Sequence, residues 1–167
     1  FAWALIEWWH NGKPTMLGAA TGAVAGLVAV TPACGFVNPI NAIFIGIIAA
    51  LICYLAIAVI KARLGYDDAL DAFGVHGVGG LWGTIATGLF AEKAVNAAGS
   101  NGLFFGNASL VGIQLLIAAV TVAFAAIMTF LIFKLVNALV GMRVEEQNEI
   151  VGLDLTEQKE AAYTVIE

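Results

Sequence analysis

One histidine lies inside a long uncharged stretch of the chain, where its side chain could help a weak acid or base to pass. His76 is the third residue of the run Gly-Val-His-Gly-Val-Gly-Gly at 74–80, and no Asp, Glu, Lys or Arg occurs from 72 to 91. A neutral imidazole offers one hydrogen-bond donor and one acceptor and titrates near neutrality, which suits such a path. The alternative is a core histidine bonded to a backbone carbonyl, and the residues alone leave both interpretations open.

Glycines surround this histidine. Gly80 follows His76 by one helical turn on the same face, so the residues beside the imidazole leave room instead of filling it. Small residues at helical spacing also let backbones approach closely inside a membrane. We expect Gly77, Gly79 and Gly80 to be close-packing positions.

Three carboxylates and a phenylalanine precede the histidine run: Asp67, Asp68, Asp71 and Phe73. Carboxylates at a helix start accept hydrogen bonds from N–H groups that lack a helical partner, and they complement the helix dipole. Capping is therefore the first role expected of these residues, and a vestibule at the inner mouth of a pore, attracting cations, is the alternative. Lys61 and Arg63 are available to pair with the aspartates.

The elements that must position these residues are apolar helices. The chain is 61% hydrophobic and only 11% charged, with a mean hydropathy of +0.94, whereas a soluble domain of this length needs more polar surface. Charged residues are absent from 14–60, 72–91 and 94–133. Each stretch provides the roughly 20 residues that a membrane-spanning helix needs, without the alternation of a barrel strand. The predicted class is an all-α polytopic membrane protein.

We expect a membrane bundle over 1–140 and a polar tail over 141–167. The bundle begins with a truncated helix over 1–9, interpreted as the cut end of a longer helix, so that this chain alone should not conduct. Four spans follow at about 16–34, 40–60, 71–90 and 110–136. Alternating these spans places every basic residue except Lys93 on one side, and the positive-inside rule makes that side and the tail cytoplasmic.

Other classes of protein lack their residue patterns. No nucleotide-binding, zinc-protease or nucleophile motif is present, so we expect neither an enzyme nor a metal or cofactor. A net charge of −5 and the absence of a basic patch argue against nucleic acid. His10 precedes Asn-Gly and is expected in a solvated turn, while Cys34 and Cys53 are expected to be packing residues without a disulfide.

The stretch at 67–80, Asp-Asp-Ala-Leu-Asp-Ala-Phe-Gly-Val-His-Gly-Val-Gly-Gly, strongly resembles the signature around the second pore histidine of the ammonium transporters, the Amt/Mep/Rh superfamily. Residues 12–28, 31–37 and 152–154 resemble the family's cytoplasmic turn with its following helix, its outer break and its regulatory tail. The resemblance runs in order through nearly all of the chain, and the tail fits the Amt branch better than the Rhesus proteins.

This resemblance implies the last part of an eleven-helix subunit, in a homotrimer with one hydrophobic pore per subunit. His76 would be the second of two in-line imidazoles that pass ammonium or ammonia, with methylammonium as an analogue, and the first would lie upstream of this chain. The resemblance further implies a plasma-membrane location and a PII-type signalling partner at the cytoplasmic face. An ammonium sensor with the same fold and a Rhesus-type gas channel are the alternatives.

The tail residues that match the family are Arg143, Gly152, Asp154 and Thr156. Gly152 must be glycine if the tail turns there with a positive φ. Thr156 matches a regulatory threonine of plant relatives, although a plain surface hydroxyl is the first expectation. Gln158 and Lys159 replace the His-Gly pair that many members carry.

Overall fold

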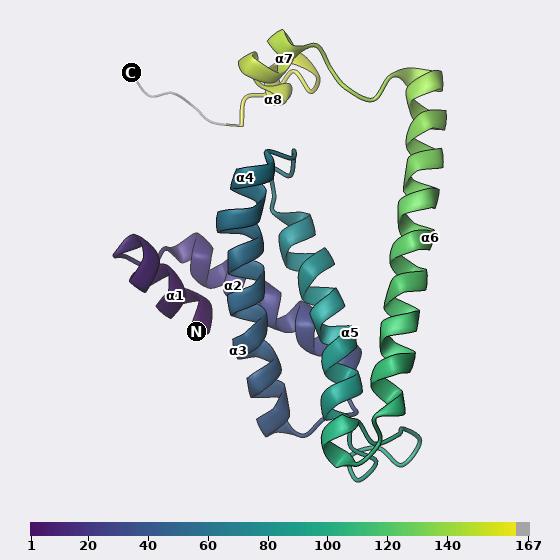
Figure 1. The fold of residues 1–167 in the computed structure, drawn as a ribbon. Helices are drawn as coiled ribbons and strands as arrows, with labels where there is room; N and C mark the ends of the chain where they lie inside the picture. The colour runs from purple at the N-terminus through teal and green to yellow at the C-terminus, as the bar shows by residue number, and fades with distance from the viewer. Residues whose placement is uncertain (163–167) are drawn as a thin grey trace. The chain divides into compact units, whose positions relative to one another are not determined.

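The structure is a computed structural model that describes residues 1–162. All regular structure in this range is helical, which confirms the predicted all-α class (Figure 1). In chain order the elements are α1 (Ala2–Asn11), α2 (Met16–Val30), the 3₁₀ turn η1 (Thr31–Ala33), α3 (Pro39–Leu55), the π-helix η2 (Ala56–Lys61), α4 (Ala62–Leu64), the π-helix η3 (Phe73–Gly77), α5 (Val78–Phe90), the 3₁₀ turn η4 (Leu103–Phe105), α6 (Ser109–Val140), α7 (Glu146–Val151) and α8 (Leu153–Thr156).

The chain forms two compact units, Phe1–Thr121 and Val122–Glu167. The first contains α1 to α5 and the beginning of α6, and the second contains the rest of α6 with α7 and α8. Within residues 1–162, three helical stretches are long and apolar enough to cross a membrane: Met16–Ala33, Pro39–Leu64 and Ser109–Val140.

The stretch predicted at 71–90 is helical from Phe73 to Phe90, through η3 and α5. It is not among the three most apolar stretches, because its glycines, its threonines and His76 lower its hydropathy. The same small and polar residues bring it into contact with other helices, and five residues of α5 are buried. Its sequence therefore reflects packing against protein more than contact with lipid.

The core of the first unit consists mainly of small side chains, which bring helix backbones close together. One cluster joins α2, α3 and α5 through buried alanines, Ile45 and the partly buried Trp82, whose indole N–H donates to the carbonyl of Ile45 at 3.0 Å. The position that a Cβ of Gly83 would take lies only 2.2 Å from the carbonyl oxygen of Ala29. Gly22 likewise makes room for Trp3, at 2.4 Å from that residue's Cβ. The helices of this unit thus meet through glycine, as small-residue spacing predicts.

Polar side chains fix the ends of these helices. Thr15 caps α2 by accepting from the N–H of Gly18 at 2.9 Å, and Asn38 caps α3 by accepting from the N–H of Asn41 at 2.9 Å. Glu7 is buried and accepts from both the N–H and the hydroxyl of Thr15, at 3.0 and 2.9 Å. This buried carboxylate fixes the turn between α1 and α2.

Two expectations outside the histidine run were wrong. His10 is exposed, as expected, but it belongs to the last turn of α1 and not to a loop, and its Nδ1 lies 2.7 Å from the hydroxyl of Tyr54 on α3, so it links two helices. Cys34 is exposed and packs against no core, because it lies just beyond the 3₁₀ turn η1. Cys53 is fully buried, as expected of a packing residue.

Candidate functional site

His76 belongs to a π-helix, a rare conformation with one extra residue per turn that is frequent at functional sites. This π-helix, η3, packs against a second one, η2, at the end of α3. The Cβ position of Gly74 lies only 2.4 Å from Cγ1 of Ile57, so Gly74 permits the close approach of the two segments. Sequence reasoning missed both π-helices, since nothing in the glycine spacing distinguishes them from α-helix.

The imidazole of His76 lines a cavity of about 370 Å³ between α2 and the start of η3. It is exposed and has no hydrogen-bond partner within the described residues. Within residues 1–162, His76 is therefore not bonded to a backbone carbonyl. The remaining lining is almost entirely apolar: Leu17, Ala20, Thr21, Val24, Leu70, Ala72 and Val75.

Thr21 contributes the second polar group of this cavity, and sequence reasoning did not single it out. The hydroxyls of Thr31, Thr84 and Thr87 donate to carbonyls four residues earlier, at 2.6 to 3.0 Å. The hydroxyl of Thr21 makes no hydrogen bond within residues 1–162, so it remains available to a ligand. Thr21 lies one turn after Leu17, on the face of α2 that η3 covers. Which face of α2 meets η3 depends on tertiary packing, so the sequence alone does not indicate that Thr21 lines this cavity.

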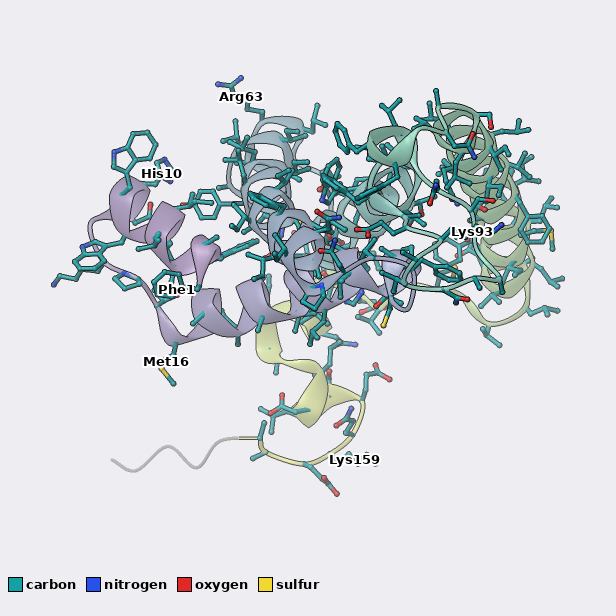
Figure 2. The ribbon with its side chains drawn as sticks, turned by 90° about the horizontal axis from the view of Figure 1, so that it is seen from below. Phe1, His10, Met16, Arg63, Lys93 and Lys159 are labelled. Atoms are coloured by element: carbon teal, nitrogen blue, oxygen red, sulfur yellow. The ribbon has the colours of Figure 1, made fainter. Side chains whose placement is uncertain are left out.

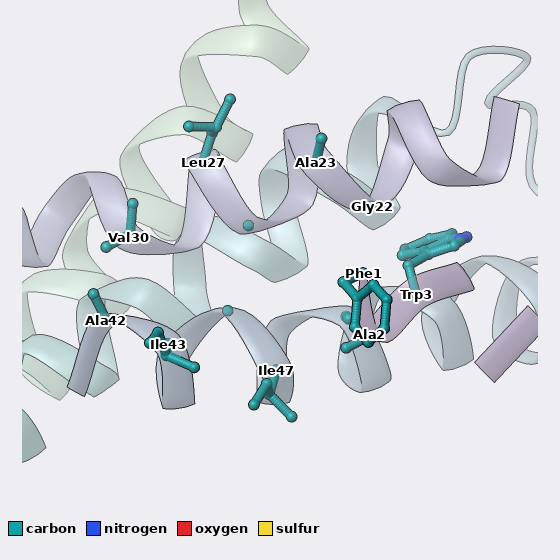
Figure 3. A pocket seen from close by; sticks show the side chains of 13 residues that line it. Phe1, Ala2, Trp3, Gly22, Ala23, Leu27, Val30, Ala42, Ile43 and Ile47 are labelled. Carbon is teal, nitrogen blue, oxygen red and sulfur yellow. The ribbon is translucent and has the colours of Figure 1, made fainter. Parts of the chain in front are cut away.

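A larger cavity of about 560 Å³ lies between α1, α2 and α3. Figure 3 shows its apolar lining, with Phe1 beside Ala2 at one end and Val30 and Ala42 at the other. None of its lining side chains is titratable. The histidine cavity is therefore the candidate functional site of this unit.

The aspartates before the histidine run shape the start of η3. The carboxylate of Asp68 accepts from the N–H groups of Ala72 and Phe73, at 2.8 and 2.9 Å, which is the geometry of a helix cap. Asp71 has the positive φ of 54°, and its Oδ1 lies 2.7 Å from Nζ of Lys61. Asp67 is exposed.

Phe73 and the neighbouring glycines differ in their packing. The ring of Phe73 is 61% exposed and lies edge-on to Tyr66, with centroids 5.9 Å apart. A Cβ added to Gly77 would lie 2.8 Å from that ring, and a Cβ added to Gly79 would lie 3.2 Å from Sγ of Cys53. Gly80 has no atom within 4 Å of its Cβ position, so within the described residues it is not a close-packing glycine. It leaves the face of His76 open.

Comparison with known proteins identifies the family of this chain. The Ammonium Transporter Family matches residues 1–163. The chain belongs to the ammonium transporter family. An ammonium transporter of Bacillus subtilis is 55% identical over 161 residues, covering 96% of this chain and 40% of the relative. Ammonium transporter Amt1 of Archaeoglobus fulgidus is 48% identical over 164 residues, covering 98% and 41%.

The crystal structure of Saccharomyces cerevisiae Mep2 is similar in fold, with a TM-score of 0.81 and 35% identity over 87% of this chain and 34% of that one. The chain thus spans about two fifths of the length of the curated relatives named above. Its family and its apolar helices identify it as a membrane protein.

The tail of this ammonium transporter chain contains its own polar contacts. Gly152 has φ 114° and ψ 130°, a conformation that only glycine adopts readily. Arg143 donates to both carboxylate oxygens of Glu149, from Nε at 2.8 Å and Nη2 at 3.0 Å, and this hydrogen bonding lowers the pKa of Glu149. Thr156 is half-buried and donates to the carbonyl of Gly152 at 3.0 Å, so it is not a plain surface hydroxyl.

Asp154 binds the last residue that the structure describes, Ala162. Its Oδ2 accepts from the N–H of Ala162 at 2.9 Å, and this backbone hydrogen bond is the main cause of a lowered pKa for the carboxyl group. Of the tail residues that resemble the family, Gly152 and Thr156 are hydrogen-bonded to each other, whereas Arg143 and Asp154 bond to other residues of the tail.

Proposed function

We propose that this chain forms part of a pore that carries ammonium or ammonia across a membrane, with His76 as a pore imidazole. The family match and the relatives named as ammonium transporters support the substrate. The observation that carries the proposal is the imidazole of His76, which has no hydrogen-bond partner within the described residues and lines a cavity that is apolar apart from Thr21.

Such a cavity favours the neutral form of the substrate. Moving bare ammonium into an apolar space costs many kcal/mol of hydration, whereas ammonia loses far less. An imidazole in the path accepts and donates hydrogen bonds and can carry a proton separately. The hydroxyl of Thr21 offers a second polar contact in the same cavity.

The remaining features of the proposal concern the whole protein. Residues 1–140 form the membrane bundle and 141–167 a cytoplasmic regulatory tail, in an eleven-helix subunit of a plasma-membrane homotrimer. The first imidazole of the histidine pair comes from outside this chain, and a PII-type signalling protein binds the cytoplasmic face. The asymmetric distribution of Lys and Arg supports the orientation.

The experiment compares His76→Ala with His10→Ala in the full-length protein, expressed in cells that lack other ammonium transporters. His76→Ala is expected either to reduce methylammonium uptake by on the order of 10²-fold, as for loss of a positioned proton carrier, or to abolish discrimination against potassium. His10 is the matched control, because it is the other histidine and lies outside the cavity. Wild-type uptake and discrimination in a folded His76→Ala protein would refute the proposal.

A further inference from the structure

Lys61 connects the end of one π-helix with the segment that starts the other. Its Nζ lies 2.7 Å from Oδ1 of Asp71 and also donates to the carbonyl oxygen of Asp68. Arg63, two residues later, is exposed and has no ion pair or hydrogen bond within the part of the chain that the structure describes. Figure 2 shows its guanidinium pointing away from the ribbon. Only one of these two basic residues therefore acts on the histidine segment.

The two residues that Lys61 binds determine the first turn of η3. Asp68 holds the N–H groups of Ala72 and Phe73 with its two carboxylate oxygens. Asp71 accepts from the N–H of Val75 through its carbonyl, at 3.0 Å. Its φ of 54° lies in the left-handed region, which a residue other than glycine adopts at a cost. Lys61 stabilises this conformation, because the same ammonium group binds Asp68 and Asp71 at once.

The position of His76 depends on this turn because η3 contains only five residues, Phe73–Gly77. No further helical turn separates the cap from the imidazole. A change from π-helix to α-helix removes one residue from a turn, which rotates the neighbouring side chains by about 100°. Such a change would direct His76 away from the cavity that it now lines with α2.

We infer that Lys61 is a positioning residue: by binding Asp68 and Asp71 it keeps the π-turn that directs His76 into the cavity. This inference rests on the proposed function of His76. Lys61 itself does not line that cavity, so it acts through the backbone of η3 and not on the substrate.

The test uses the full-length protein with Lys61→Met, Lys61→Arg and the matched control Arg63→Met. Methylammonium uptake, discrimination against potassium and the thermal midpoint of the purified protein are measured for each. Lys61→Met is expected to reduce uptake by about tenfold, since displacing an active group by 1 Å can cost up to 10²-fold. Lys61→Arg keeps the charge and restores most of the uptake, and Arg63→Met matches the wild type. Asp71→Asn, which tolerates the same φ, breaks the ion pair from the other side and gives a similar loss.

A double variant separates positioning from general stability. If Lys61 acts through His76, Lys61→Met causes no further loss in a His76→Ala background. An additive loss, or a lowered thermal midpoint with wild-type uptake per folded protein, overturns the inference. Wild-type uptake in both Lys61→Met and Asp71→Asn also overturns the inference. If His76→Ala is impaired in the same experiment, the proposed function of His76 still stands. A wild-type His76→Ala refutes the proposed function and the inference together.

Discussion

At Gly83 the backbone of α5 lies close against that of α2, so this glycine gives a sharp test of the packing. A Cβ added there would lie 2.2 Å from the oxygen and 3.0 Å from the carbon of the Ala29 carbonyl. Real Cβ contacts begin near 3.0 Å, so α5 and α2 must separate by roughly 0.8 Å. Both obstructing atoms belong to the backbone and cannot rotate away. Overpacking of this kind costs about 1–3 kcal/mol, and alanine returns about 0.5–1 kcal/mol as the better helix former.

Gly83→Ala should therefore destabilise the protein by a net of about 1 kcal/mol, and by up to about 2.5 kcal/mol if the helices cannot adjust. Gly79→Ala is the matched control, one turn earlier on the same face. Its Cβ would meet the Sγ of Cys53 at 3.2 Å and Val28 at 3.5 Å, which are side chains that can shift by a few tenths of an ångström. The assay is the thermal midpoint of the purified full-length protein at one scan rate. Equal midpoints for Gly83→Ala and wild type would show that the helices do not approach as closely as this structure has them.

Two predictions concern the tail. Gly152→Ala should cost about 1–3 kcal/mol of local stability, because φ is 114° and a Cβ would lie 2.6 Å from Oδ1 of Asp154. Faster limited proteolysis near residue 152 would show this loss. Gly141→Asn is the control, because Gly141 has a φ of 74° and open space around its Cβ position. Glu149 should titrate below its ordinary pKa of 4.5, since Arg143 stabilises the carboxylate. Its contribution to folding is then complete above pH 4.5 and is lost as the pH falls through the lowered pKa. Carboxyl NMR of Glu149 in wild type and Arg143→Gln measures the shift, and equal midpoints would contradict it.

The helices of the membrane bundle were the most predictable part of the fold. Long uncharged runs must satisfy their backbone groups internally, so composition alone specifies helix. Their ends followed from local chemistry as well, since Asn38 and Pro39 start α3 and the stretch predicted from about 16 to 34 is helical from Met16 to Ala33. The positive φ of Gly152 is also a local property, because few residues other than glycine adopt it.

Features that depend on contacts between helices could not be predicted. The sequence predicts a turn at His10, whereas the structure places it in α1, where its bond to Tyr54 joins residues 44 positions apart. The buried carboxylate of Glu7 depends on the space that Gly18 leaves, where a Cβ would lie 2.1 Å from its Oε2. The π-helices depend on the close approach of Gly74 to Ile57, and a pattern of apolar residues cannot distinguish i→i+4 from i→i+5 hydrogen bonding.

The hydrogen-bonding state of His76 decides what the proposed pore can do with it. A histidine bonded to its own chain would lose that bond on binding a solute, at a net cost of about 0.5–1.5 kcal/mol. His76 has no such partner among the described residues, and Gly80 leaves the neighbouring face open. A polar solute that enters the cavity therefore displaces no hydrogen bond that the imidazole makes within residues 1–162. Neither Lys61 nor Ile57 contacts the ring nitrogens, and within the described residues neither nitrogen has a hydrogen-bond partner, so in the proposed pore both could bind a solute or carry a proton.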